Sequence, residues 1–225
     1  MTGEGDTAGA IRVFIVDDHT LVREWLGHLL RRERDFELVG EADAPAPALT
    51  AMLRQPPDVA VVDISLKQGS GLELIKDLRA QLPEVEIVVL SMYDGVSDVR
   101  RAFRAGATGY VMKSESTGQI APAIRAARAG RMFANATVLA KLNAQLMGAP
   151  AEEAALDLLS DREVDVFRRL AAGQSTRQIA EDLGVGLKTV QTYCGRMKEK
   201  LGLADGAALA LFAVRWQERG TRPLT

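Results

Sequence analysis

Short apolar runs alternate with amphipathic stretches over the first half of the chain. The apolar runs are rich in branched side chains and cover residues 13–16, 59–62, 87–90 and 110–112. Runs of this kind are typical of buried parallel strands. Stretches with helical periodicity lie between them, at residues 21–30, 72–82 and 99–105. The alternation predicts an α/β fold, a doubly wound parallel sheet with helices on both faces.

A polar residue follows each of these runs. They are Asp17 and Asp18, Asp63, Ser91 and Lys113. Because the carboxyl ends of parallel strands meet at one edge of a sheet, we expect these side chains to share one shallow cleft. A single aspartate at the end of a strand is usually a helix cap or a turn residue, but agreement among four strand ends favours a site.

Three carboxylates in one cleft require a compensating cation. Mg²⁺, a hard divalent ion with oxygen ligands, would satisfy Asp17, Asp18 and Asp63 and leave positions for phosphate oxygens. Lys113 would add a second positive charge. Such a site suits phosphoryl transfer, in which Asp63 is the candidate nucleophile.

Residues 11–130 resemble the receiver domains of two-component response regulators, which have a flavodoxin-like five-stranded sheet. The resemblance rests on Val-Asp-Asp-His at 16–19, Val-Val-Asp-Ile at 61–64, Leu-Ser-Met at 90–92 and Gly-Tyr-Val-Met-Lys at 109–113. It implies that a histidine kinase phosphorylates Asp63 and that Asp18 and Asp63 hold Mg²⁺, with Asp17 helping through water. It also implies that Ser91 and Lys113 bind phosphoryl oxygens. Tyr110 falls where the family has a switching aromatic, and an ordinary packed aromatic is the alternative.

Two positions depart from the receiver pattern. Lys67 stands where proline is common, so the loop after Asp63 lacks a conformational restraint. Ser114 follows Lys113 where many relatives have proline, which makes a cis peptide there less favourable.

The last third of the chain has the pattern of a small all-α domain. Ser160 and Glu163 form a capping-box pattern, and Gly173 ends the helix that follows. Ser175 then begins a helix over residues 176–183, and a Gly-containing turn leads into another over 187–201. This arrangement predicts a helix-turn-helix unit, whose second helix enters the major groove of DNA.

The helix over 187–201 has one apolar and one polar face. Val190, Cys194, Met197 and Leu201 recur at helical spacing, so we expect them in the core, with Cys194 acting as a small hydrophobic residue. The polar face is an ordinary solvated surface or a DNA-binding surface. Four motifs bear on this choice: Leu-Ser-Asp-Arg-Glu-Val-Asp-Val at 159–166, Ala-Gly-Gln-Ser-Thr-Arg-Gln-Ile-Ala at 172–180, Lys-Thr-Val at 188–190 and Lys-Leu-Gly-Leu at 200–203. With these motifs residues 159–216 resemble the LuxR-type helix-turn-helix, and the resemblance favours the DNA-binding surface. That resemblance implies dimerisation through residues 205–217 and DNA contacts by six residues: Thr176, Lys188, Thr189, Gln191, Thr192 and Arg196.

Composition and charge agree with two domains. Of 225 residues 47% are hydrophobic and 26% charged, which describes a globular protein. From Leu159 onward there are 11 Lys and Arg against 8 Asp and Glu, and the remainder has 17 against 22. A basic second half suits a polyanion. One cysteine suits a reducing cytoplasm, and no apolar run approaches the ~18 residues of a membrane span.

The expected organisation is therefore a flexible tail over residues 1–10, a receiver over 11–130, a linker helix and loop over 131–158, and a helix-turn-helix domain over 159–225. With both halves combined, the chain resembles NarL/FixJ-type response regulators. We expect a non-enzymatic transcriptional regulator that is phosphorylated by a histidine kinase and binds double-stranded DNA as a homodimer.

Two alternatives come from other classes of protein. One is an aspartate-nucleophile phosphatase, which usually needs an acid two residues after the nucleophile; Ser65 stands there. The other is a phosphorylation-independent DNA-binding regulator whose receiver is a docking or dimerisation module.

Overall fold

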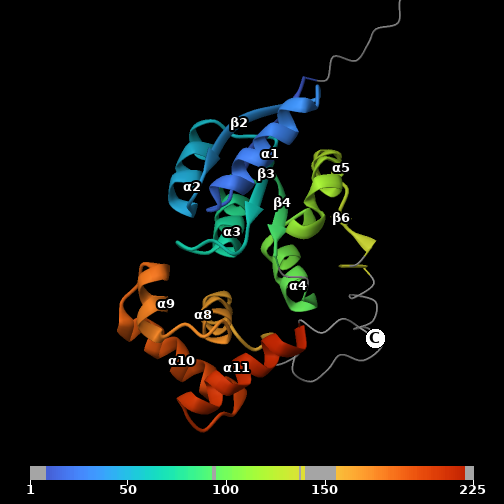
Figure 1. Cartoon of the computed structure of the whole chain (residues 1–225). Coiled ribbons are helices and arrows are strands. Elements are labelled where there is room, and N and C mark those ends of the chain that lie inside the picture. Colours follow the sequence, from blue (N-terminus) through green and yellow to red (C-terminus); the bar gives the residue numbers. More distant parts are fainter. Residues whose placement is uncertain (1–8, 93–94, 137, 140–155, 221–225) are drawn as a thin grey trace, which may run out of the picture.

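The first domain is a parallel sheet with helices on both faces (Figure 1). The computed structural model describes residues 9–92, 95–136, 138–139 and 156–220, so most of the predicted N-terminal tail lies outside the described residues. All strand pairs are parallel, in the order β2-β1-β3-β4-β5-β6. The strands are β1 (Ile11–Val16), β2 (Phe36–Ala42), β3 (Val59–Asp63), β4 (Glu86–Ser91), β5 (Gly109–Met112) and β6 (Phe133–Ala134).

Alternate side chains of the central strands build two separate cores, because successive residues of a strand point to opposite faces. Val13 and Ile15 pack with α1 (Thr20–Arg32) and α5 (Ser116–Arg128) on one face. Phe14 and Val16 pack on the other face with helices α2 (Pro45–Arg54), α3 (Gly71–Gln81) and α4 (Val96–Ala105). A short 3₁₀ helix, η1 (Lys113–Glu115), joins β5 to α5. The covered sheet fixes the polar ends of β1, β3, β4 and β5 at one edge.

The prediction of five strands is wrong, because the described sheet has six. Gly130 takes a left-handed φ of 66° after α5 and turns the chain back along the open edge of β5. The Phe133 amide then donates to the Thr108 carbonyl at 3.0 Å. The predicted linker therefore begins with a strand, and helical residues resume at Ala136, Val138 and Leu139. Residues 140–155, which make up more than half of the predicted linker helix and loop, lie outside the described residues.

The second domain consists of helices, as predicted. They are α8 (Asp161–Ala171), α9 (Thr176–Leu183), α10 (Leu187–Leu201) and α11 (Gly206–Gly220). Ser160 and Ser175 each form a capping box, with Glu163 and Gln178 respectively. The Phe167 ring is fully buried and contacts the rings of Phe212 and Trp216 at centroid distances of 5.9 and 5.5 Å. These contacts tie α11 to α8. Among the described helices, none is long and apolar enough to cross a bilayer.

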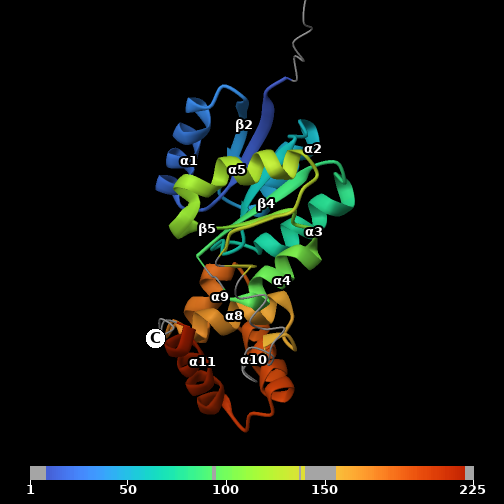
Figure 2. The ribbon, with the colours of Figure 1, turned by 90° about the vertical axis from the view of Figure 1, so that its right-hand side faces the viewer.

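The helical domain lies against the end of the receiver that carries α4 (Figure 2). Helix α8 contacts this end through ion pairs with α3 and α4. The carboxyl edge of the sheet therefore lies near the boundary between the two domains.

Gly71 tests how tightly the loop after β3 packs. A Cβ atom there would lie 2.2 Å from the carbonyl oxygen of Asp63 and 2.6 Å from the Cα of Ile64. We expect Gly71→Ala to lower the free energy of unfolding by about 1–3 kcal/mol, because backbone atoms must move. Gly118→Ala is the control, since that helical position is open and alanine there should stabilise by about 0.5–1 kcal/mol. Denaturant unfolding measures both, and equal stability of Gly71→Ala and the wild type would contradict the packing argument.

Candidate functional site

Three aspartates meet at the carboxyl edge of the sheet. Asp17 and Asp18 follow β1, and Asp63 is the last residue of β3. Asp17 and Asp63 are fully buried, and the Asp18 side chain is 7% exposed. One ligand atom from each of these residues and from His19 lies within 4.8 Å of the others. The prediction that the carboxylates share one site agrees with this geometry.

Lys113 supplies the cation that faces these carboxylates. Its Nζ lies 2.6 Å from Asp63 Oδ2 and 2.7 Å from Asp17 Oδ2. Burial raises the pKa of the Asp63 carboxyl, and the Lys113 charge opposes that rise. Burial alone would lower the pKa of Lys113, but Asp63 and Asp17 together raise it. Lys113 therefore stays charged in a pocket that holds two buried carboxylates.

The donor set fits a hard divalent cation. Three carboxylates are the oxygen ligands that Mg²⁺ prefers. Among the described residues, Asp18 Oδ1 is buried and accepts no hydrogen bond, and its near neighbour is His19 Nδ1 at 2.9 Å. Asp18 and Asp63, with Asp17 beside them, are the residues that would hold the ion.

The loop after β3 binds the same carboxylates through its backbone. The Ser65 amide donates to Asp63 Oδ1 at 2.7 Å, and the Lys67 amide donates to Asp18 Oδ2 at 3.0 Å. Lys67 Nζ lies 3.8 Å from the same Asp18 oxygen. The loop that lacks proline is therefore held by hydrogen bonds to the acidic residues.

Ser91 and Tyr110 lie on the neighbouring strands β4 and β5. Ser91 ends β4 and is fully buried, in register with Met112. Tyr110 is also fully buried and belongs to the core formed with α2, α3 and α4. Its place in this structure is that of a packed aromatic, and its switching role stays a prediction.

His19, for which the sequence predicted no role, follows the aspartate pair directly. Its amide donates to Asp17 Oδ1 at 2.8 Å, and its ring Nδ1 lies 3.2 Å from that oxygen. The Val-Asp-Asp-His motif contained the signal, since a side chain one residue beyond Asp18 remains at the same strand end.

The polar side of α10 is exposed. We call Lys188, Thr189, Gln191, Thr192 and Arg196 the predicted DNA-contact face, and all five are exposed. Thr176, at the start of α9, is partly exposed. On the opposite side, Val190 and Met197 are fully buried, whereas Cys194 is half-buried against the core. The predicted inward face is therefore correct, with Cys194 nearer its margin than expected.

Two family models match the chain. The response regulator receiver domain matches residues 13–125, and the luxR family of bacterial regulatory proteins matches residues 157–213. The chain is a response regulator of the NarL/LuxR family. The predicted family and fold class are confirmed.

Named relatives of this regulator span nearly its whole length. The DNA-binding transcriptional activator DevR/DosR of Mycobacterium tuberculosis is 36% identical over 203 residues, which are 90% of this chain and 94% of that protein. A putative transcriptional regulator of Pseudomonas aeruginosa is 37% identical over 205 residues, or 91% and 97% of the two chains. Both names describe regulators of transcription and not enzymes, in agreement with the predicted class.

Solved structures share the fold. A LuxR-family two-component response regulator from Aurantimonas is 29% identical with a TM-score of 0.60, covering 62% of this chain and 99% of that one. RcsB of Salmonella enterica serovar Typhimurium, bound to a promoter with a phosphomimetic, has a TM-score of 0.67 and covers 92% of this chain and 100% of its own. At 24% identity the second likeness shows the fold alone.

A buried ion pair joins the two domains of this regulator. Asp98 in the first turn of α4 pairs with Arg168 of α8. The two side chains are 4% and 9% exposed. Removing one partner of such a pair leaves an uncompensated buried charge, so the contact is selective for this docking arrangement.

Arg101 of α4 holds the start of α8. Its guanidinium pairs with Asp161 at 2.8 Å and donates to the carbonyl oxygens of Leu156 and Leu159. Further polar contacts surround it: Lys76 with Asp161, Arg100 and Ser97 with Asp157, and Arg162 with Glu73. No local pattern in the sequence indicates this network, because its partners are 55–89 residues apart along the chain and look like ordinary surface charges.

Asp165 makes the stability of this regulator depend on pH. Burial of this α8 residue raises the pKa of its carboxyl to about 7. The positive charges of Arg169 and Arg162 oppose the rise, and the negative charges of Asp161 and Glu73 add to it. The folded chain thus keeps a proton that the unfolded chain loses near pH 3.8, so the free energy of unfolding falls as pH rises from about 4 to 7. We expect Asp165→Asn to reduce that fall.

Denaturant midpoints measured between pH 5 and 8 check this expectation. The raised pKa of Asp63 contributes with the same sign, so the fall should be smaller in Asp165→Asn and not absent. The exposed Asp77→Asn is the control and should keep the wild-type slope. An unchanged slope in Asp165→Asn would rule out this carboxyl as the source.

Proposed function

We propose that a sensor histidine kinase phosphorylates Asp63, and that this controls sequence-specific binding of double-stranded DNA by a homodimer. The observation that carries the proposal is the pocket in which Asp17, Asp18 and Asp63 face Lys113, with Ser91 at the end of the adjacent strand. Such a pocket positions phosphoryl oxygens and neutralises their charge, which is most of what phosphoryl transfer requires. The cytoplasm is the proposed location.

In the proposed transfer, a carboxylate oxygen of Asp63 attacks the phosphorus of a phosphohistidine. The new P–O bond forms as the P–N bond breaks, and the leaving imidazole takes up a proton. Lys113, already 2.6 Å from Asp63 Oδ2, would pair with one phosphoryl oxygen, and the Ser91 hydroxyl would donate to another. Bound Mg²⁺ would supply further neutralisation of the phosphoryl charge.

The DNA-binding part of the proposal rests on the helical domain. The predicted DNA-contact face is exposed, with Thr176 at the start of the preceding helix. The proposed dimer surface lies on α11, where Leu211 and Val214 expose 52% and 37% of their area. Two copies would read two half-sites about one helical turn, or a multiple of it, apart.

Intact mass after incubation with Mg²⁺ and acetyl phosphate tests the phosphorylation site. We expect wild type to gain one phosphoryl group and Asp63→Asn to gain none, because the nucleophilic oxygen is replaced by an amide. Asp77→Asn, an exposed aspartate on α3, is the control and should be modified like the wild type. Modification of Asp63→Asn would contradict the assignment, and failure of every form would favour the phosphorylation-independent alternative.

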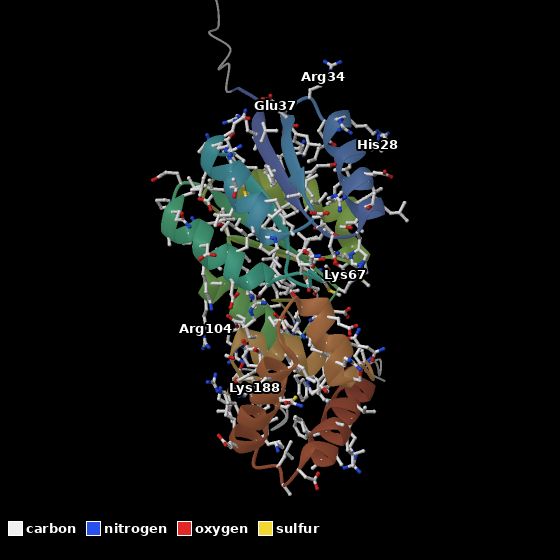
Figure 3. The ribbon with its side chains drawn as sticks, turned by 90° about the vertical axis from the view of Figure 1, so that its left-hand side faces the viewer. His28, Arg34, Glu37, Lys67, Arg104 and Lys188 are labelled. Carbon is white, nitrogen blue, oxygen red and sulfur yellow. The ribbon has the colours of Figure 1, made fainter. Side chains whose placement is uncertain are left out.

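Lys188 tests the predicted DNA-contact face. We expect Lys188→Gln to weaken binding to any duplex and to lower the slope of log K against log salt by about 0.9, because one phosphate contact is lost. Arg34→Gln is the control, since Arg34 lies at the far end of the receiver from Lys188 (Figure 3). Fluorescence anisotropy over a salt series gives both slopes, and equal losses in the two variants would indicate only a change in net charge.

A further inference from the structure

One peptide group connects the acidic pocket to the DNA-binding domain. The N–H of Lys67 donates to Asp18 Oδ2 at 3.0 Å, and the carbonyl of Leu66 accepts from Arg169 Nη2 of α8 at 3.2 Å. These two groups belong to the same planar unit, the Leu66–Lys67 peptide, so neither can turn without the other.

Both ends of this connection are anchored. The Leu66 side chain is 2% exposed and packs in the receiver core. Arg169 is held on α8, where its Nη1 donates to the carbonyl of Asp165 at 3.2 Å. Figure 3 shows Lys67 at the end of the receiver that faces the helical domain. The peptide therefore lies between two fixed partners.

The Asp18 end of the connection depends on the residue at position 67. Proline at that position, which the receiver pattern favours, has no N–H and could not donate to Asp18. The loop restraint that proline would give is replaced here by a hydrogen bond to a carboxylate of the proposed metal site.

We propose that the Leu66–Lys67 peptide couples cation binding at Asp18 to the contact between Arg169 and the receiver, and that the two oppose each other. This inference rests on the proposed function, because it takes Asp18 as a cation ligand. The peptide is a positioning group that acts through Asp18.

The sign follows from hydrogen-bond chemistry. The negative charge of Asp18 polarises the Leu66–Lys67 peptide and makes the Leu66 carbonyl a better acceptor for Arg169. A cation that binds the Asp18 carboxylate draws negative charge away from Oδ2, the oxygen that accepts from the Lys67 amide, and so reduces that polarisation. By reciprocity, losing the Arg169 contact must tighten cation binding by the factor with which the cation weakens that contact.

A double-mutant cycle on Mg²⁺ affinity tests the coupling without phosphorylation. The forms are wild type, Arg169→Met, Lys67→Pro and the double variant, titrated with Mg²⁺ in a calorimeter. We expect Arg169→Met to tighten Mg²⁺ binding about fivefold in the wild-type background and to change it less than about twofold in the Lys67→Pro background.

Two controls separate the peptide from charge alone. Lys67→Ala removes the ammonium but keeps the N–H, so Arg169→Met should still tighten binding about fivefold there. Arg177→Met removes an exposed guanidinium on α9 that pairs with Glu181, and should leave the affinity unchanged.

Three results would overturn the inference. The first is no effect of Arg169→Met on Mg²⁺ affinity, and the second is no binding of Mg²⁺ by wild type. The third is an equal effect of Arg169→Met with and without the Lys67 amide, which would indicate that the charge of Arg169 acts through space. The mass measurement on Asp63 is separate. Uncoupled Mg²⁺ binding with phosphorylation intact would reject only the peptide connection, whereas absent phosphorylation would reject the proposed function.

Discussion

The ammonium of Lys113 is the charge on which the pocket depends. It lies between Asp17 and Asp63, two fully buried carboxylates that come from the ends of different strands. Without a cation there, burial and mutual repulsion would favour protonation of one carboxylate or separation of the strand ends. The same ammonium joins η1 to the ends of β1 and β3. One interaction therefore both balances the charge of the pocket and holds these strand ends together.

The sequence predicted the parts of this regulator that are buried and periodic. The four apolar runs became β1, β3, β4 and β5, and the polar residue after each marked the pocket. Strand β2 was not singled out, because only Phe36 is buried among its seven residues and it lies at an edge. Strand β6 was missed because two residues carry no periodicity. The pairing of Asp98 with Arg168 depends on docking between domains, which no local pattern encodes.

Docking of α8 leaves the predicted DNA-contact face exposed. The receiver contacts α8, the first helix of the domain, whereas the polar side of α10 is open to solvent. Under the proposed function, phosphorylation therefore controls DNA binding by setting where the DNA-binding domain is held and how two copies can be arranged. It does not have to uncover the residues that would contact DNA.

The burial of Asp98 under α8 also has a consequence for self-association. The first turn of α4 is already covered within one chain, since Val96, Ser97 and Asp98 are all buried. A second molecule that approached this turn would compete with α8, and its apparent affinity would be multiplied by the fraction of molecules that are undocked, which weakens the association. Association through α11 meets no such competition. The docked α8 therefore competes, at any protein concentration, with a second molecule for the first turn of α4, and it leaves α11 available.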